Sequence, residues 1–153
     1  LLGGAVRCDA HHMTAPAPGG RRLAETMKAA LRDAGCAESD VDYVNAHGTA
    51  TPANDQTEAE AIHRVFGSTP PPVSSSKSAF GHTLGAAGAL EAYVCAAALK
   101  HQGIPPTLNT QSCLHEFPLD LVLGAARAVP LRVVLSNSLA FGGNNACLVL
   151  AAR

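Results

Sequence analysis

The sequence lacks tryptophan and has few aromatic or charged residues. Its 153 residues include four Phe and two Tyr, and charged residues make up only 15% of the chain. Eleven Lys and Arg face 12 Asp and Glu, so the net charge is -1 and no long-range field attracts nucleic acid or anionic lipid. We therefore expect no nucleic-acid partner. Because aromatic residues are few, we also expect a core of closely packed small residues.

The cysteines show no organised pattern. The five lie at positions 8, 36, 95, 113 and 147, without CxxC or CxxH spacing. An odd, scattered set predicts neither a disulfide framework nor a zinc site, and we expect no bound metal. Cys95 and Cys147 are expected to be buried as small apolar residues, whereas Cys8, Cys36 and Cys113 fall near predicted loops. A reducing, cytoplasmic location fits this set best.

Long apolar runs are also missing. The opening LLGGAVRCDAHHM turns polar at Arg7, so it has no signal-peptide pattern. Residues 83–99, TLGAAGALEAYVCAAAL, are apolar, but the run is short, rich in Gly and Ala, and contains Glu91. We expect a buried helix here and no membrane span.

The hydrophobic fraction of 47% suffices for a core, and the apolar periodicity predicts helices alternating with strands. Strands are predicted near the start and over VDYVNA, and helices over residues 21–34, from DQTE to Gly67, and as one long helix from Gly81 to His101. VSSSKS, LDLVLG, RVVLSN and ACLVLAA are further strand candidates, the last two joined by a turn at Gly142 and Gly143. This order predicts a layered α/β domain.

Polar side chains follow two of these strands where each strand ends. His47 comes directly after VDYVNA, and Lys77 lies at the end of the next predicted strand, with His82 just after it. Ligands of such folds gather beyond the carboxyl ends of the strands. If the two strands are neighbours, both histidines face one pocket.

Three segments, in the order NAHGTATPANDQTEAEAI, SSSKSAFGHTLGAAGALEA and LSNSLAFGGNNACLVL, resemble the C-terminal half of a β-ketoacyl-[acyl-carrier-protein] synthase. IPPTLN lies between the second and third segments, as in that family of KAS II-like ketosynthases within the thiolase-fold superfamily. The resemblance implies a layered α-β-α half with a mixed sheet. Residues 1–153 would be the C-terminal domain, and residues 1–20 the strand and loop that cross between the halves.

The resemblance also implies a reaction, the decarboxylative Claisen condensation of malonyl-ACP with an acyl group, in fatty acid or polyketide biosynthesis. The chain would then be part of an acyltransferase. Substrates would arrive on the phosphopantetheine of acyl carrier protein, so no separate cofactor is expected. Further expected partners are the N-terminal ketosynthase half or a second subunit.

Carried over by motif, His47 and His82 would assist loss of carbon dioxide and stabilise the enolate oxygen. Preplaced donors in a dry site suit that charge. Lys77 matches the lysine of the KSxxGH motif, which orders the second histidine, and Glu91 matches its carboxylate partner. We expect this ion pair to have a structural role as much as a catalytic one.

Further site residues follow from the same resemblance. Thr49 and Thr51, in HGTAT, match threonines whose hydroxyls contact the phosphopantetheine arm. Phe141, in LAFGG, matches a gating phenylalanine whose backbone N–H completes an oxyanion hole, and Gly142 would let its loop move. Isolated histidines are more often structural than catalytic, but the HGT and KSxxGH contexts together favour the catalytic interpretation.

The sequence departs from the family pattern in two respects. The nucleophilic cysteine of the family lies in a TACSS-type turn of the N-terminal half, and none of the cysteines here has that context. The third motif reads AFGGNN instead of GFGGTN, so Ala140 restricts φ beside the Phe141 gate. Without the other half, we also expect an exposed apolar surface.

Other interpretations stay open at this point. The histidines alone could decarboxylate malonyl thioesters weakly, or the chain could be a catalytically incomplete, truncated paralogue that binds a partner. A thiolase proper is disfavoured because its second half brings a cysteine in a CxG context, where this chain has FGGNN.

Overall fold

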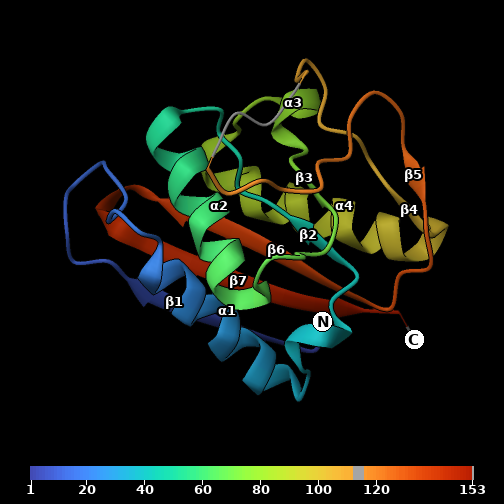
Figure 1. The fold of residues 1–153 in the computed structure, drawn as a ribbon, viewed down its shortest axis with the longest axis horizontal. Coiled ribbons are helices and arrows are strands. Elements are labelled where there is room, and N and C mark those ends of the chain that lie inside the picture. The colour runs from blue at the N-terminus through green and yellow to red at the C-terminus, as the bar shows by residue number, and fades with distance from the viewer. Residues whose placement is uncertain (112–115, 153) are drawn as a thin grey trace.

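The computed structural model describes residues 1–111 and 116–152. Its five-stranded sheet has the order β1-β7-β6-β2-β3 (Figure 1). The strands are β1 (Gly3–Cys8), β2 (Tyr43–Asn45), β3 (Val73–Ser74), β6 (Val133–Ala140) and β7 (Asn144–Ala151). β2 runs parallel to both β3 and β6, whereas β7 is antiparallel to β6 and β1. The sheet is therefore mixed, as expected.

Helices cover both faces of this sheet. They are α1 (Arg21–Ala34), α2 (Pro52–Phe66), the short α3 (Lys77–Phe80) and α4 (Ala87–His101). Val44 and Leu135 pack in the cluster formed with α1 and α2, whereas their neighbours Tyr43 and Val134 pack with α4. Because successive strand side chains point to opposite faces, this alternation gives two cores and confirms the α-β-α layering.

The predicted helix at residues 21–34 coincides with α1. Leu23, Met27 and Leu31 recur on its buried face, and Gly35 ends the helix with a left-handed φ of 67°. At the other end, Gly20 lies against α2 so closely that an added Cβ would stand 2.3 Å from the carbonyl oxygen of Thr57. α1 and α2, which precede and follow the loop that carries His47, are thus fixed against each other.

The predicted capping box at DQTE is wrong. α2 begins at Pro52, with Thr51 at its N-cap, and it continues to Phe66 before Gly67 ends it. A proline suits the first helical position because its missing N–H would have had no intrahelical partner there. Glu58 therefore lies inside the helix, and its carboxylate is free for another role.

The single long helix predicted from Gly81 to His101 is also wrong. The chain forms α3, leaves the helical conformation at Gly81, makes a 3-10 turn over Leu84–Ala86 and only then begins α4. Gly81 has φ 78° and Leu84 has φ 52°, and neither left-handed residue can continue a right-handed helix. The break places His82 in an irregular segment between the two helices.

Two strand predictions need correction. VSSSKS gives a strand of only Val73–Ser74, because α3 starts at Lys77. LDLVLG makes isolated bridges at Leu121 and Leu123 instead of a strand. A second small sheet instead pairs β4 (Gly103–Ile104) with β5 (Arg127–Ala128). The last two predicted strands are present as β6 and β7, joined at Phe141–Gly143.

An apolar surface is exposed along α3 and α4, as expected. Leu84 and Tyr93 are 77% and 73% exposed. Phe80 and Leu90, on the same stretch of the chain, are also exposed. The opposite face of α4 is buried against the sheet through Cys95 and Leu99. A helix that is apolar on both faces is typical of the interior of a larger fold. Within the described residues, none of the helices has the length and apolar character needed to cross a bilayer.

The cysteines divide as predicted where the structure describes them. Cys95 and Cys147 are buried, Cys8 is exposed and Cys36 is half-buried, all as free thiols. Cys113 lies outside the described residues.

Candidate active site

The two strands that precede the polar residues are neighbours. Asn45, the last residue of β2, is paired in parallel with Ser74, the last residue of β3. The segments that follow therefore leave the sheet at the same edge. His47 lies two residues beyond the first strand, and Lys77 lies three residues beyond the second.

The side chains of these segments converge. The imidazole rings of His47 and His82 stand edge to face, with centroids 5.5 Å apart and an interplanar angle of 87°. The Lys77 ammonium lies 3.1 Å from Nδ1 of His47. The expectation that both histidines face one place is therefore met, although 35 positions separate them in the chain.

Hydrogen bonds fix the same tautomer in both rings. An ammonium can only donate, so Nδ1 of His47 accepts from Lys77 and the ring proton sits on Nε2. Nδ1 of His82 accepts the backbone N–H of Leu84 at 3.3 Å, which again leaves the proton on Nε2 when the ring is neutral. The site thus carries two imidazole donors of one kind.

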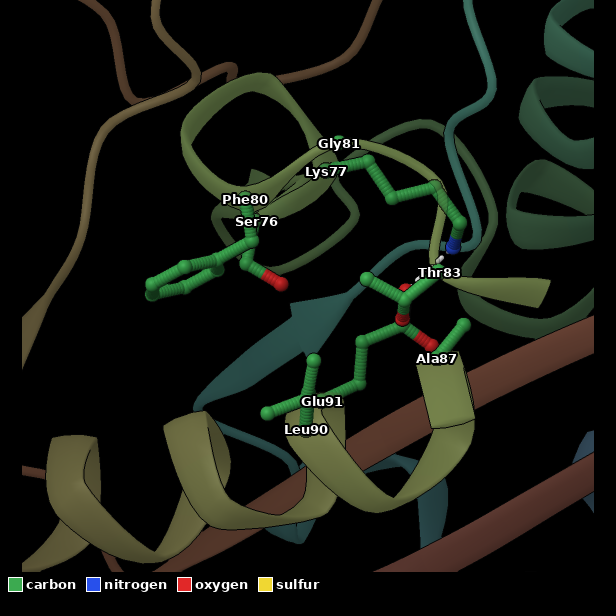
Figure 2. A pocket seen from close by; sticks show the side chains of 8 residues that line it. All are labelled: Ser76, Lys77, Phe80, Gly81, Thr83, Ala87, Leu90 and Glu91. Carbon is green, nitrogen blue, oxygen red and sulfur yellow. Dashed lines mark hydrogen bonds and ion pairs between the residues drawn. The ribbon is translucent and has the colours of Figure 1, made fainter. Parts of the chain in front are cut away.

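Lys77 and Glu91 form a buried ion pair. Figure 2 shows the lysine reaching from α3 and the glutamate from α4, so that the charged ends meet between the two helices. Only 7% and 2% of the two side chains are exposed. Burial raises the pKa of Glu91, and the neighbouring Lys77 and the hydroxyl of Ser138 oppose that rise. The pair orients Lys77 toward His47 and links α4 to the site.

Glu58 is a site residue that the sequence analysis missed. Its carboxylate accepts the backbone N–H of His47 and of Gly48, each at 2.9 Å, and the side-chain amide of Asn137 at 3.2 Å. Burial raises the pKa of Glu58, and these donors oppose the rise. The signal was available, since Glu58 precedes the buried Ile62 by one helical turn on the apolar face of α2.

The remaining predicted residues lie around this centre without contacting the rings in the contacts that the structure records. Thr49 and Thr51 follow His47, with their hydroxyls 2.9 Å apart and Ala50 between them in a left-handed conformation. Phe141 is 75% exposed in the turn between β6 and β7, and Gly142 beside it has φ 81°. Ser138, three residues before Phe141, connects that turn to Glu91.

His47 is neutral at physiological pH. Burial, together with the adjacent Lys77 charge and His82, lowers the pKa of His47 to about 3. A neutral ring can donate from Nε2 without carrying a positive charge into the site. Among the described residues, no cluster of three or more His, Cys, Asp or Glu is placed to hold a metal ion.

This pKa predicts a pH dependence of stability. The unfolded chain binds a proton on His47 below its ordinary pKa of 6.5, whereas the folded chain does so only near 3. His47 therefore destabilises the fold as pH falls through that window. Between about pH 7.5 and about pH 5 its contribution is roughly 2 kcal/mol. In urea denaturation, His47→Asn should lose about that much less stability on acidification than the wild type, and equal losses would contradict this.

Known proteins match both the sequence and the geometry. Residues 1–111 match the family model described as the beta-ketoacyl synthase, C-terminal domain. The chain belongs to the β-ketoacyl synthase family. A curated relative, the 3-oxoacyl-[acyl-carrier-protein] synthase 2 of Coxiella burnetii, is 46% identical over 99% of this chain and 37% of its own length. The chain thus spans a little over a third of that relative.

Solved ketosynthases share the fold. The ishigamide ketosynthase/chain length factor superposes with a TM-score of 0.96 at 44% identity, over 100% of this chain and 38% of that one. A ketosynthase in complex with its type II polyketide synthase acyl-carrier protein gives the same TM-score of 0.96 at 34% identity, with the same coverage of 100% and 38%. These matches confirm the thiolase-like C-terminal half that the three sequence segments predicted.

Proposed function

We propose that this chain supplies the two-histidine centre of a β-ketoacyl synthase that elongates an acyl group with malonyl-ACP. The observation that carries the proposal is the convergence of His47, Lys77 and His82 beyond adjacent parallel strands. The nucleophilic cysteine would come from the N-terminal half of the enzyme, on a longer chain or a second subunit. The route would be fatty acid or polyketide biosynthesis, in the cytoplasm, where free thiols such as Cys8 persist.

In the proposed reaction, the C–C bond to the malonyl carboxylate breaks and carbon dioxide leaves. The electron pair becomes the enolate of the thioester, whose oxygen would accept the Nε2–H groups of His47 and His82. The enolate carbon then bonds to the acyl carbonyl carbon, and the C–S bond breaks to return the cysteine thiolate. Donors fixed before the charge develops lower the barrier most, because they need no reorganisation.

The ion pair has a positioning role in this scheme. Lys77 donates to Nδ1 of His47 and so holds its proton on Nε2, while Glu91 holds Lys77. Lysine alone would add a full positive charge beside His47. The carboxylate limits that charge locally, so the ring is oriented without making its surroundings strongly cationic.

Thr49, Thr51, Phe141 and Gly142 would form the entrance. The two hydroxyls directly after His47 suit the amides of a phosphopantetheine arm, because they donate and accept without charge. The exposed ring of Phe141, on a turn with Gly142, suits a gate to the acyl pocket. No separate cofactor enters this scheme, since the arm belongs to the carrier protein.

Reconstitution tests the proposal. This chain would be mixed with the N-terminal half of a β-ketoacyl synthase chosen because it contains a TACSS-type cysteine, and assayed with acyl-ACP and malonyl-ACP. We expect a 3-oxoacyl product that requires both polypeptides, and none when the cysteine of the N-terminal half is replaced by alanine. A stable complex that makes no product would overturn the assignment of the histidines to condensation.

A second function is favoured by one observation, the exposed apolar surface along Phe80, Leu84 and Tyr93. A truncated paralogue could use that surface to bind a partner without catalysing anything. The two functions differ in what the histidines do. If His47→Ala and His82→Ala leave partner binding and all biological activity unchanged, the binding function replaces the catalytic one.

A further inference from the structure

The turn Phe141–Gly143, between β6 and β7, is held by hydrogen bonds from several segments. Gly142 and Gly143 have φ 81° and 76°, a conformation that glycine adopts without strain. The turn also carries the exposed ring of Phe141. A two-glycine turn is inherently free to change shape, so whatever fixes it also fixes the position of that ring.

Each carbonyl of the turn accepts a hydrogen bond. The carbonyl of Phe141 accepts from the side chain of Asn144 at 3.0 Å, and that of Gly142 accepts from the thiol of Cys8 at 3.3 Å. The carbonyl of Gly143 accepts the backbone N–H of Asp9 at 2.8 Å. The turn is therefore tied to the segment that follows β1 as well as to its own strands.

The peptide group between Phe141 and Gly142 is hydrogen-bonded at both its N–H and its carbonyl. Its N–H donates to the carbonyl of Met13 at 2.7 Å, and its carbonyl is the group that Asn144 holds. The peptide is thus clamped on both sides. The Met13 contact is backbone to backbone, so the Asn144 amide is the one side chain in this clamp.

Ala140, the residue before Phe141, also favours the observed conformation of the turn. Its backbone lies at φ -140° and ψ 160°, an extended conformation that alanine adopts without strain. Alanine is stable in this conformation, whereas glycine at position 140 would give the backbone access to further conformations. Both residues on which the third motif departs from GFGGTN, Ala140 and Asn144, therefore favour the observed turn.

We propose that Asn144 is a positioning residue that latches the Phe141 turn, so that the ring moves only when the Asn144 amide releases the Phe141 carbonyl. The inference rests on the proposed function insofar as Phe141 guards the acyl pocket. In that role the latch sets how often an acyl group can enter.

Fluorine NMR of the chain labelled with 4-fluorophenylalanine tests the latch. The four phenylalanines give four resonances, and Phe141→Leu identifies the one from the turn. Asn144→Asp keeps the side-chain shape but removes the donated N–H. We expect the rate of exchange at Phe141 to rise about three- to tenfold, as loss of one net hydrogen bond allows, while the other three resonances stay unchanged. Ala140→Gly should raise the rate further.

Asn109→Asp is the matched control, since it makes the same chemical and charge change at an exposed asparagine outside the turn. An unchanged Phe141 resonance in Asn144→Asp, or an equal change in Asn109→Asp, would overturn the latch. The measurement needs no substrate and no second half. A failed reconstitution would therefore count against the proposed function alone, and a failed NMR test against the latch alone.

Discussion

Replacing Glu91 with leucine should lower the free energy of unfolding by about 3–5 kcal/mol, because it leaves the Lys77 ammonium buried without its counter-charge. The two side chains are 7% and 2% exposed, so water can solvate the remaining charge only after the structure opens. The hydrogen bond to Nδ1 of His47 compensates in part, since the neutral ring accepts one of the three N–H groups of the ammonium. Urea denaturation at neutral pH measures the loss.

The double variant Lys77→Met, Glu91→Leu is the control for this prediction. Removing both charges and keeping similar volume often restores stability, because desolvation of the pair cancels much of its mutual attraction. We expect the double variant to recover most of what Glu91→Leu loses. If the two variants are equally destabilised, the loss comes from packing of α4 and not from an unpaired charge.

Replacing either histidine with alanine in the reconstituted enzyme should slow decarboxylation of malonyl-ACP by about 10²–10³-fold, the usual cost of removing one oxyanion donor. Both rings present Nε2–H and their centroids are 5.5 Å apart, so one enolate oxygen can reach both. The losses should not add, because residues that serve one charge act as a unit. Release of carbon dioxide from labelled malonyl-ACP gives the rate.

His63→Ala is a suitable control for the histidine variants, since His63 lies on α2 and bonds the carbonyl of Pro118 away from the centre. It should leave decarboxylation unchanged. The double variant His47→Ala, His82→Ala measures whether the two losses add. If its loss of activation free energy equals the sum of the single losses, the rings act on different atoms and the shared-donor mechanism is wrong.

Much of the site could be predicted because its residues follow strand ends. Once β2 and β3 are neighbours in parallel, His47 and Lys77 have to leave the sheet at the same edge, and the sequence contains enough to place both. His82 was harder, since the alanine-rich run favours a continuous helix on propensity alone. The left-handed Leu84 overrides that preference, and no local pattern announces it.

Glu58 was missed for a related reason. A carboxylate at the start of a predicted helix is normally a cap, and DQTE has the spacing of one. Its true partners, the N–H groups of His47 and Gly48, lie eleven and ten residues back, and only the packing of α2 on the sheet brings them together. Its place on the apolar face of α2 marks Glu58 as buried, but the identity of its partners depends on tertiary geometry, which periodicity does not encode.

The tautomer and proximity of the two rings test the central claim most directly, on this chain alone. Long-range ¹H–¹⁵N NMR at neutral pH should show His47 as a neutral ring protonated on Nε2, with a cross-ring NOE to His82. A proton on Nδ1 of His47, or no NOE between the rings, would contradict the account, because the paired Nε2 donors would then not exist.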